Sequence, residues 1–227
     1  YDESINKRKI IGLSGLPGSG KSTLGFWIDS VARDLDLDIK VISLDDFYLP
    51  ALEMDIAMKG NPWNVPRGLP GSHSIDLLNN TLDSYLRTGK LKHPKFDKSL
   101  RNGSGDRSGW SESNPKVLIL EGWFVGCEPL MDRDKLNYNS NNHNKINLNK
   151  FECEYRHFIQ DKLYRYSQVW SMFSKTWHLK STNIENTIIW KNQQENEMFK
   201  LKGSALSGNE LSNFIRMIQA SIPHDSL

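Results

Sequence analysis

Residues 14–23 of the chain read S-G-L-P-G-S-G-K-S-T and directly follow an apolar run. The spacing Gly15-x-x-x-x-Gly20-Lys21-Ser22 matches the P-loop pattern. Glycines allow the backbone to turn its N–H groups toward an anion, and a helix beginning near Lys21 would add its positive dipole end. An ordinary glycine-rich turn is the alternative. The apolar strand before the loop and the helical residues after it favour a nucleoside triphosphate site.

The residues of this loop have distinct expected roles. Lys21 would reach the terminal phosphates of ATP, and the Ser22 hydroxyl would ligate Mg²⁺. Backbone N–H groups would surround the phosphates, because no Cβ atoms stand in the way at the glycines. The expected ATP-binding set is Gly15, Leu16, Pro17, Gly18, Ser19, Gly20, Lys21, Ser22 and Thr23.

Length and composition bound the class of protein. The chain has 227 residues, 37% of them hydrophobic, and a formal net charge of +2. That length fits a single domain over residues 1–227, and the small charge gives no broad field for a polyanion, so nucleic acid is not an expected partner. No apolar run approaches membrane length, so no membrane partner is expected. Nothing in the composition indicates an oligomeric state.

Two weaker features bear on the cellular compartment. The chain has two cysteines, Cys127 and Cys153, and their spacing is not that of metal ligands. Such sparse use of cysteine is typical of proteins in a reducing compartment. The polar residues 1–4 do not resemble a signal peptide. We therefore expect a cytoplasmic protein, or an organellar one if a targeting segment has been removed.

Short apolar runs alternate with segments of helical spacing along the chain. The expected strands are residues 10–14, 39–44, 117–120 and 177–179, and the expected helices run from the loop to about residue 35 and over 75–87, 151–166, 184–199 and 208–220. This alternation predicts an α/β fold with a mostly parallel sheet, right-handed crossovers and helices on both faces. A further apolar strand is expected where residues 221–227 stand, and its absence would leave a sheet edge uncovered.

Three segments between these elements are predicted to be loops. Residues 50–73 are rich in Pro, Gly and Asn, and residues 88–115 are basic and glycine-rich. Loops of this length inside compact domains are usually functional or disordered, and we expect both to be excursions that build the site of a second substrate. Residues 137–150, dense in Asn, are expected to form a solvated loop without chemistry.

Acidic residues follow the second and third expected strands. Ligands collect at the carboxyl ends of parallel strands, where Asp45 and Glu121 would join the glycine-rich loop. Asp45 could accept a hydroxyl proton or bind Mg²⁺ through water; a turn or cap aspartate is the alternative, and Asp46 could hold the role instead. Glu121 ends an apolar strand as a Walker-B-type carboxylate does. The expected catalytic residues are Lys21, Asp45 and Glu121, and the expected metal ligands are Ser22, Asp45 and Glu121.

Basic side chains gather in the two excursions. Arginine suits forked recognition of a carboxylate or phosphate. Each basic residue alone would be a surface charge, or in the case of histidine a structural residue, but together they indicate an anionic acceptor. Aspartates in the same segment could orient these cations or bind the acceptor's hydroxyls. The expected acceptor-binding set is Asp45, Tyr48, Arg67, His73, Asp97, Lys98, Arg101 and Arg107.

A second group of basic residues lies after the fourth expected strand. Lys191, Lys200 and Lys202 could supply positive charge to a transferring phosphoryl group from a lid near residues 191–208. A solvated helix face explains these lysines nearly as well.

Several blocks of the sequence resemble the plant and cyanobacterial type of D-glycerate 3-kinase, within the P-loop kinase group that includes uridine kinase, phosphoribulokinase and pantothenate kinase. The P-loop is common to many families, whereas R-G-x-P-G-S-H and F-D-K-S-x-R-x-G-x-G-D-R are specific to this one. The resemblance covers nearly the whole chain in order. The matching blocks are residues 10–24, 43–49, 67–73, 96–107 and 118–126, with a lid-like region at 190–195 and 203–207.

The resemblance implies transfer of the γ-phosphoryl group of ATP to a hydroxyl of D-glycerate, with Mg²⁺ as cofactor and a small hydroxy acid as partner. This chain has Ser74 where the family usually has Asp, Lys191 where it usually has Arg, and Cys127 where it often has an aromatic residue. Lys in place of Arg keeps the charge but loses the fork. Two alternatives stay open: a kinase of another small alcohol, such as a nucleoside or a pantothenate-like compound, and a catalytically impaired ATP-binding regulator of the same fold.

Overall fold

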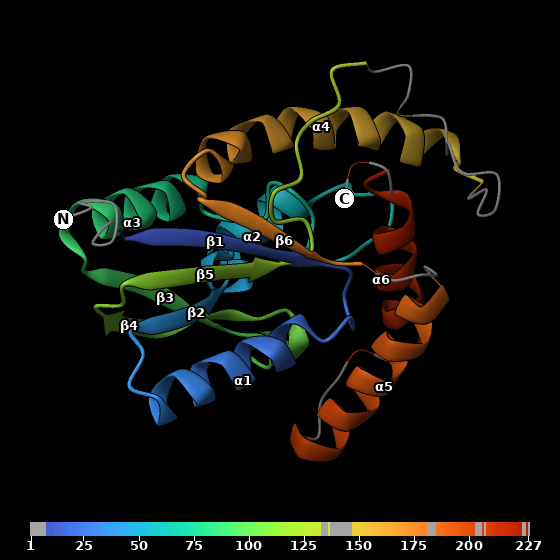
Figure 1. Cartoon of the computed structure of the whole chain (residues 1–227). Helices are drawn as coiled ribbons and strands as arrows, with labels where there is room; N and C mark the ends of the chain where they lie inside the picture. Colours follow the sequence, from blue (N-terminus) through green and yellow to red (C-terminus); the bar gives the residue numbers. More distant parts are fainter. Residues whose placement is uncertain are drawn as a thin grey trace.

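A four-stranded parallel sheet forms the centre of the computed structural model, which describes residues 8–132, 136, 147–180, 185–202, 206, 208–223 and 226 (Figure 1). The strand order is β2-β5-β1-β6. The expected apolar runs form these strands, so the predicted α/β class with a parallel sheet is confirmed. The strands are β1 (Lys9–Gly15), β2 (Ile39–Ser43), β5 (Val117–Gly122) and β6 (Lys175–Leu179).

Helices cover both faces of this sheet. The helix α1 (Lys21–Asp34) packs on β1, β2 and β5 from one side, while α3 (Ile75–Thr88) and α4 (Lys150–Trp170) contact each other on the opposite side (Figure 1). The periodic apolar pattern of α3 explains its placement, because its buried apolar and aromatic residues recur at helical spacing. They are Ile75, Leu78, Leu82 and Tyr85, and all four belong to the main core.

The strand register brings the predicted active residues to one edge of the sheet. Glu121 on β5 pairs in register with Leu13 on β1 and with Ser43 on β2. Because the strands are parallel, their carboxyl ends all point toward α5 (Glu185–Lys202) and α6 (Gly208–Ala220), which stand beyond that edge (Figure 1). The glycine-rich loop, the segment after β2 and the end of β5 therefore meet at the edge of the sheet that faces these two helices.

The first predicted excursion is not wholly a loop, because residues 51–58 form the helix α2 (Ala51–Met58). The apolar residues of this segment point in different directions. Met54 and Met58 are buried, whereas Leu52 and Ile56 are more than three-quarters exposed. A helix with apolar residues on both faces has no periodic signal, which is why the sequence did not reveal it.

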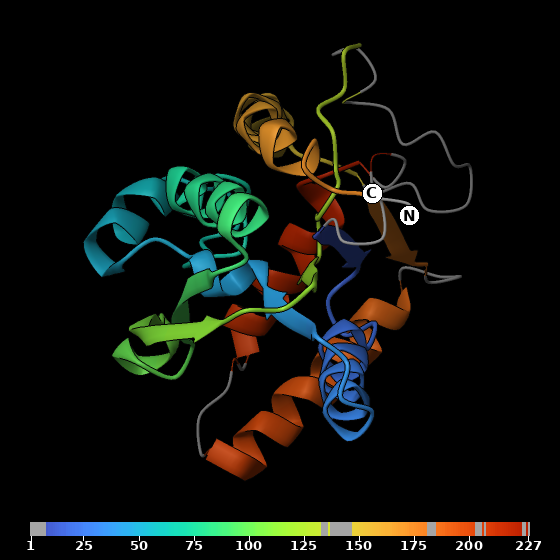
Figure 2. The same ribbon diagram turned by 60° about the vertical axis from the view of Figure 1, so that its left-hand side comes forward.

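The second predicted excursion contains an antiparallel hairpin of β3 (Leu91–Asp97) and β4 (Asp106–Ser113). In Figure 2 this hairpin stands apart from the main sheet, on the side of α2 and α3. β4 contains Gly109, an irregularity interrupts the pairing between Lys95 and Phe96, and Pro94 lies within β3. These features hide strand alternation in the sequence. Only residues 98–105 remain as a connection between the two strands.

Two further points concern the boundaries of the fold. The edge strand β6 is exposed at Lys175, Thr176, Trp177 and His178, and within the described residues no other strand pairs with its outer side. The asparagine-rich segment expected as a loop lies largely outside the described residues. Among the helices that the structure describes, none has both the length and the apolar character needed to cross a membrane.

Candidate active site

The glycine-rich loop wraps the amino end of α1. Gly18 and Gly20 have φ angles of +82° and +88°, which side chains disfavour, and Gly20 caps the helix in the left-handed conformation. Lys21, only 7% exposed, curls back so that its ammonium donates to the carbonyl oxygen of Leu16 at 3.0 Å. The Ser19 hydroxyl is buried and has no hydrogen-bond partner in the described part of the chain. A phosphate oxygen would supply that missing partner.

A hydroxyl and a carboxylate lie together at the start of α1. Ser22 Oγ donates to Glu121 Oε1 at 3.2 Å, and Glu121 also accepts a hydrogen bond from Ser43. Mg²⁺ in phosphate sites commonly takes one or two protein oxygens and completes its octahedron with water and phosphate oxygens. In the described residues no three His, Cys, Asp or Glu side chains converge on one point. The Ser22 and Glu121 oxygens fit such a sparsely ligated Mg²⁺.

The charges of this site act on one another. Burial lowers the pKa of Lys21 to about 8, although the negative charges of Glu121 and Asp45 oppose that shift. Burial likewise raises the pKa of Glu121, with Lys21 as the main opposing charge. The three groups predicted to be catalytic from separate strand ends therefore lie within electrostatic reach of one another.

The two neighbouring aspartates after β2 have different partners. Asp45 accepts from the Lys98 ammonium at 2.6 Å. Burial alone would raise the pKa of Asp45, but the charge and hydrogen bond of Lys98 outweigh it and hold that pKa well below its usual range. Asp46 instead accepts from Phe96 N at 3.3 Å and from Lys95 Nζ at 3.2 Å, so it anchors β3. The geometry thus assigns Asp45 to the site and Asp46 to the hairpin.

An aromatic pair lies next to Asp45. Tyr48, which is 3% exposed, makes a side-chain hydrogen bond to Asp45, and burial raises the pKa of its phenol. His73 stacks on Tyr48 with ring centroids 4.5 Å apart and an interplanar angle of 19°. A backbone bridge between the same two residues fixes this arrangement. Both residues predicted to bind the acceptor are therefore beside the candidate base.

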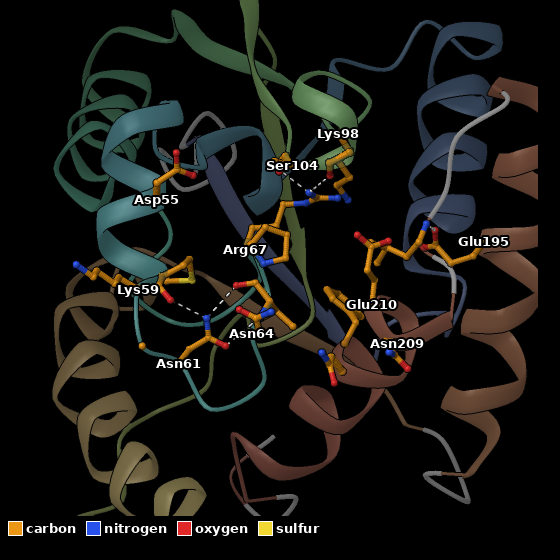
Figure 3. Close-up of a pocket in the computed structure, with 18 of the residues that line it drawn as sticks. Asp55, Lys59, Asn61, Asn64, Arg67, Lys98, Ser104, Glu195, Asn209 and Glu210 are labelled. Carbon is orange, nitrogen blue, oxygen red and sulfur yellow. Dashed lines mark hydrogen bonds between the residues drawn. The ribbon is translucent and has the colours of Figure 1, made fainter.

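A cavity of about 560 Å³ opens beside this group (Figure 3). Arg67, 7% exposed, donates through Nη1 to the carbonyl oxygens of Gly103 and Ser104 at 2.5 and 2.9 Å. Figure 3 shows Arg67 and Lys98 next to each other on one wall. Other lining residues come from α2, from the turn after it and from α5 and α6; they include Asp55, Asn61, Asn64, Glu195, Asn209, Glu210 and Phe214.

The remaining predicted acceptor residues lie farther from this wall. Arg101 pairs with Asp55 at 2.7 Å on the exposed rim. Arg107 donates to the Tyr48 carbonyl oxygen at 3.3 Å and to Ser74 Oγ at 2.7 Å, so it ties β4 to the aromatic pair. Ser74, which replaces the aspartate usual in the resembled family, therefore contacts Arg107.

Asp97 is engaged within its own turn. Its Oδ1 accepts from the backbone N–H and the hydroxyl of Ser99, at 2.8 and 2.6 Å. This contact shapes the segment that carries Lys98, which is the side chain of the turn that reaches Asp45.

The predicted lid meets the loop through the first half of α5. A Cβ atom added to Gly18 would stand 2.6 Å from Trp190 Cβ, so the two segments touch. Lys191 is 8% exposed, forms an ion pair with Glu195 and lies over the Phe214 ring at 4.8 Å. Burial lowers the pKa of Lys191, and the positive charges of Lys98 and Arg67 lower it further. Lys191 is therefore within electrostatic reach of the two cations that line the cavity.

The other lid lysines are placed differently. Lys200 is exposed near the far end of α5, so the structure does not bring it to the site. The side chain of Lys202 and residues 203–205 and 207 lie outside the described residues.

Sequence reasoning missed two partners of the site. Glu195 lies four residues after Lys191, a helical spacing that could have identified the ion pair. Tyr166 contacts His73 Nδ1 at 2.9 Å from a position 93 residues away, and no local pattern points to it.

A glycine-rich loop at the amino end of α1, a Ser–Glu pair beside it and an aspartate after the neighbouring strand of a parallel sheet define a P-loop kinase. No protein-family model matches the sequence. The chain is 32% identical over 217 residues to “Uncharacterized kinase mug58” of Schizosaccharomyces pombe, covering 91% of this chain and 76% of the relative. It is 30% identical over 219 residues to “D-glycerate 3-kinase, chloroplastic” of Arabidopsis thaliana, covering 91% of this chain but 45% of that protein.

Solved structures give the same result. The structure of D-glycerate 3-kinase from Cryptococcus neoformans superposes with a TM-score of 0.78 at 28% identity, over 95% of this chain and 78% of that one. The chain belongs to the P-loop kinase family that contains these proteins, whose members are ATP-dependent kinases of small molecules. The family resemblance drawn from the sequence blocks is confirmed.

Proposed function

We propose that this kinase transfers the γ-phosphoryl group of ATP to a hydroxyl of D-glycerate and produces 3-phosphoglycerate. The observation that carries the proposal is that Arg67 and Lys98 line one cavity, where Lys98 pairs with the candidate base Asp45 at 2.6 Å and Lys191 lies within electrostatic reach of both cations. Like charges gathered in a partly buried space favour an anionic ligand. A small hydroxy acid supplies both a carboxylate for these cations and a hydroxyl for phosphorylation. The relatives named D-glycerate 3-kinase support this acceptor.

The residues near the cavity have separate roles in binding and activating the acceptor. Arg67 and Lys98 hold the acceptor's carboxylate by charge-assisted hydrogen bonds. Asp45, ionised throughout the physiological pH range because its pKa is held low, accepts the proton of the attacking hydroxyl. Tyr48, hydrogen bonded to the same carboxylate, keeps it oriented.

The nucleotide side of the site is built from the loop and the lid. The loop N–H groups and Lys21 hold the phosphates of ATP, and Lys191 approaches from α5 to balance the charge on the group in transfer. Ser22 and Glu121 would hold Mg²⁺, and Asp45, whose negative charge acts on Glu121, would serve as a further ligand through a water molecule. When bound, Mg²⁺ neutralises charge on the phosphate oxygens.

A coupled ADP-release assay tests the acceptor. The purified protein is supplied with Mg-ATP and, in separate reactions, D-glycerate, L-glycerate, other hydroxy acids, nucleosides and pantothenate-like alcohols. The proposal expects turnover with D-glycerate to exceed that with every other compound. If the protein turns over an uncharged alcohol faster than D-glycerate, the assignment of D-glycerate as the acceptor is wrong. Tight ATP binding with no turnover on any compound would instead indicate a regulator that has lost kinase activity.

A further inference from the structure

His73 is enclosed by aromatic rings that fix its orientation. It is 4% exposed and stacks on Tyr48. Phe124 and Tyr166 meet it edge-on, with ring centroids 5.7 and 5.9 Å away and interplanar angles of 64° and 85°. These three rings fix the plane of the imidazole and therefore the directions of its two nitrogens.

The hydrogen bonds around Nδ1 determine which nitrogen carries the proton. The Tyr166 oxygen accepts from Gly71 N at 3.0 Å and lies 2.9 Å from His73 Nδ1. The Ser72 hydroxyl donates to the Leu69 carbonyl oxygen at 2.6 Å, so its proton is not directed at the ring. The Tyr166 proton therefore points to Nδ1, since the reverse arrangement would leave a fully buried phenol proton without an acceptor among the described residues.

Protonation states agree with this assignment. Burial lowers the pKa of His73 to about 4, so its imidazole is neutral at neutral pH. Burial raises the pKa of Tyr166 well above its usual value, so its phenol keeps its proton. A neutral imidazole with an occupied Nδ1 lone pair carries its single proton on Nε2.

The Nε2 nitrogen has no hydrogen-bond partner in the part of the chain that is described, although it is buried. Unpaired buried N–H groups are unfavourable, so an external acceptor is expected. The charged groups that act on His73 are Asp45 and Lys98, which pair with each other at 2.6 Å, and Lys98 lines the cavity. Tyr48, on which His73 stacks, is itself hydrogen bonded to Asp45. An oxygen of a ligand beside Asp45 would complete the hydrogen bonding of Nε2.

We propose that Tyr166 is a positioning residue for the phosphoryl acceptor: its hydroxyl holds His73 in the Nε2–H tautomer, and His73 Nε2 donates a hydrogen bond to a carboxylate or hydroxyl oxygen of the acceptor. His73 then binds the acceptor and is not a base, because its lone pair is used by Tyr166. The identity of that acceptor rests on the proposed function, whereas the tautomer is a property of the protein alone.

Nitrogen NMR of the ligand-free protein tests the tautomer directly. Two-bond ¹H–¹⁵N correlations, assigned with His73→Gln, are expected to show a protonated Nε2 and a bare Nδ1. In Tyr166→Phe the same ring is expected to populate both tautomers. A wild-type His73 protonated on Nδ1 would overturn the proposal, and this result does not depend on which acceptor the enzyme uses.

Steady-state kinetics test the consequence for the acceptor. Loss of one hydrogen bond predicts that Tyr166→Phe raises the KM for D-glycerate about tenfold while the KM for ATP stays constant. The control is Tyr164→Phe on the same helix, because Tyr164 is 72% exposed; it is expected to match the wild type. An unchanged acceptor KM in a Tyr166→Phe protein with mixed tautomers refutes the positioning role.

A second pair of variants keeps the proposal testable if Tyr166→Phe does not fold. A glutamine amide can place its N–H near the position of Nε2, whereas an asparagine amide reaches only the position of Nδ1. His73→Gln should therefore retain a lower acceptor KM than His73→Asn, and equal KM values contradict the donor role. If wild-type protein fails to phosphorylate D-glycerate, only the proposed function fails, and these measurements use the acceptor identified by the panel.

Discussion

Replacing Asp45 by Asn removes a charge from the candidate base while keeping its shape. Loss of a general base lowers turnover by about 10²-fold or more, which corresponds to about 2.7 kcal/mol of activation free energy. The same change breaks the 2.6 Å ion pair with Lys98, whose side chains are 28% and 44% exposed. Pairs with that much exposure contribute only about 0–1 kcal/mol to stability. Asp45→Asn should therefore keep nearly the stability of the wild type while its turnover falls by about 10²-fold or more.

Three measurements separate these effects. Turnover is measured by coupled ADP release, Mg-ATP affinity by isothermal titration calorimetry, and folding by thermal unfolding. Asp46→Asn is the matched control, because Asp46 contacts the β3 backbone and Lys95, and it should keep most of the turnover. Turnover within about tenfold of wild type in Asp45→Asn, or a larger loss in Asp46→Asn, refutes the assignment of the base. If Asp45→Asn loses Mg-ATP affinity together with turnover, Asp45 serves the metal site and is not the base for the acceptor hydroxyl.

Three further predictions follow from the loop and the cavity. Lys21 must be protonated to hold phosphate, so with its pKa lowered to about 8 the kcat/KM for ATP should fall as pH rises through about 8, and a pH profile without that limb contradicts the assignment. Gly18→Ala should raise the KM for ATP more than Gly20→Ala in steady-state assays, because both have positive φ but only Gly18 touches α5. Arg67→Ala should raise the acceptor KM about ten- to a hundredfold, whereas Arg101→Ala on the rim should change it little; equal effects would mean that the cavity is not the acceptor site.

The strands of the main sheet and its parallel character could be predicted from local patterns. Three of its strands, β1, β2 and β5, contain short apolar runs, and α3 places apolar residues at helical spacing. The hairpin β3–β4 and the helix α2 were not predicted. In β4 no residue is fully buried, and in α2 apolar side chains lie both inside and outside, so burial does not follow a regular period in either element. Such elements are stabilised by contacts with the rest of the fold rather than by their own pattern.

Part of the candidate site was also accessible from the sequence. The P-loop spacing identified Lys21 and Ser22, and the strand-end rule identified Asp45 and Glu121, because parallel strands carry their chemistry at one edge. The sequence could not choose between Asp45 and Asp46, which are adjacent along the chain. Their separation depends on side-chain direction: one carboxylate meets Lys98 in the site and the other meets the backbone of β3.

The amino-acid sequence alone supplies the chemical groups of the site: a phosphate loop, strand-end carboxylates and a surplus of basic residues in two excursions. Which of those basic residues line the cavity depends on how the chain folds. Arg67 and Lys98 line it, whereas Arg101 pairs with Asp55 on the rim and Arg107 holds Tyr48 and Ser74. The physical reason is that such partners lie tens of residues apart in the chain, and a local pattern carries no information about contacts that form only when distant segments pack together.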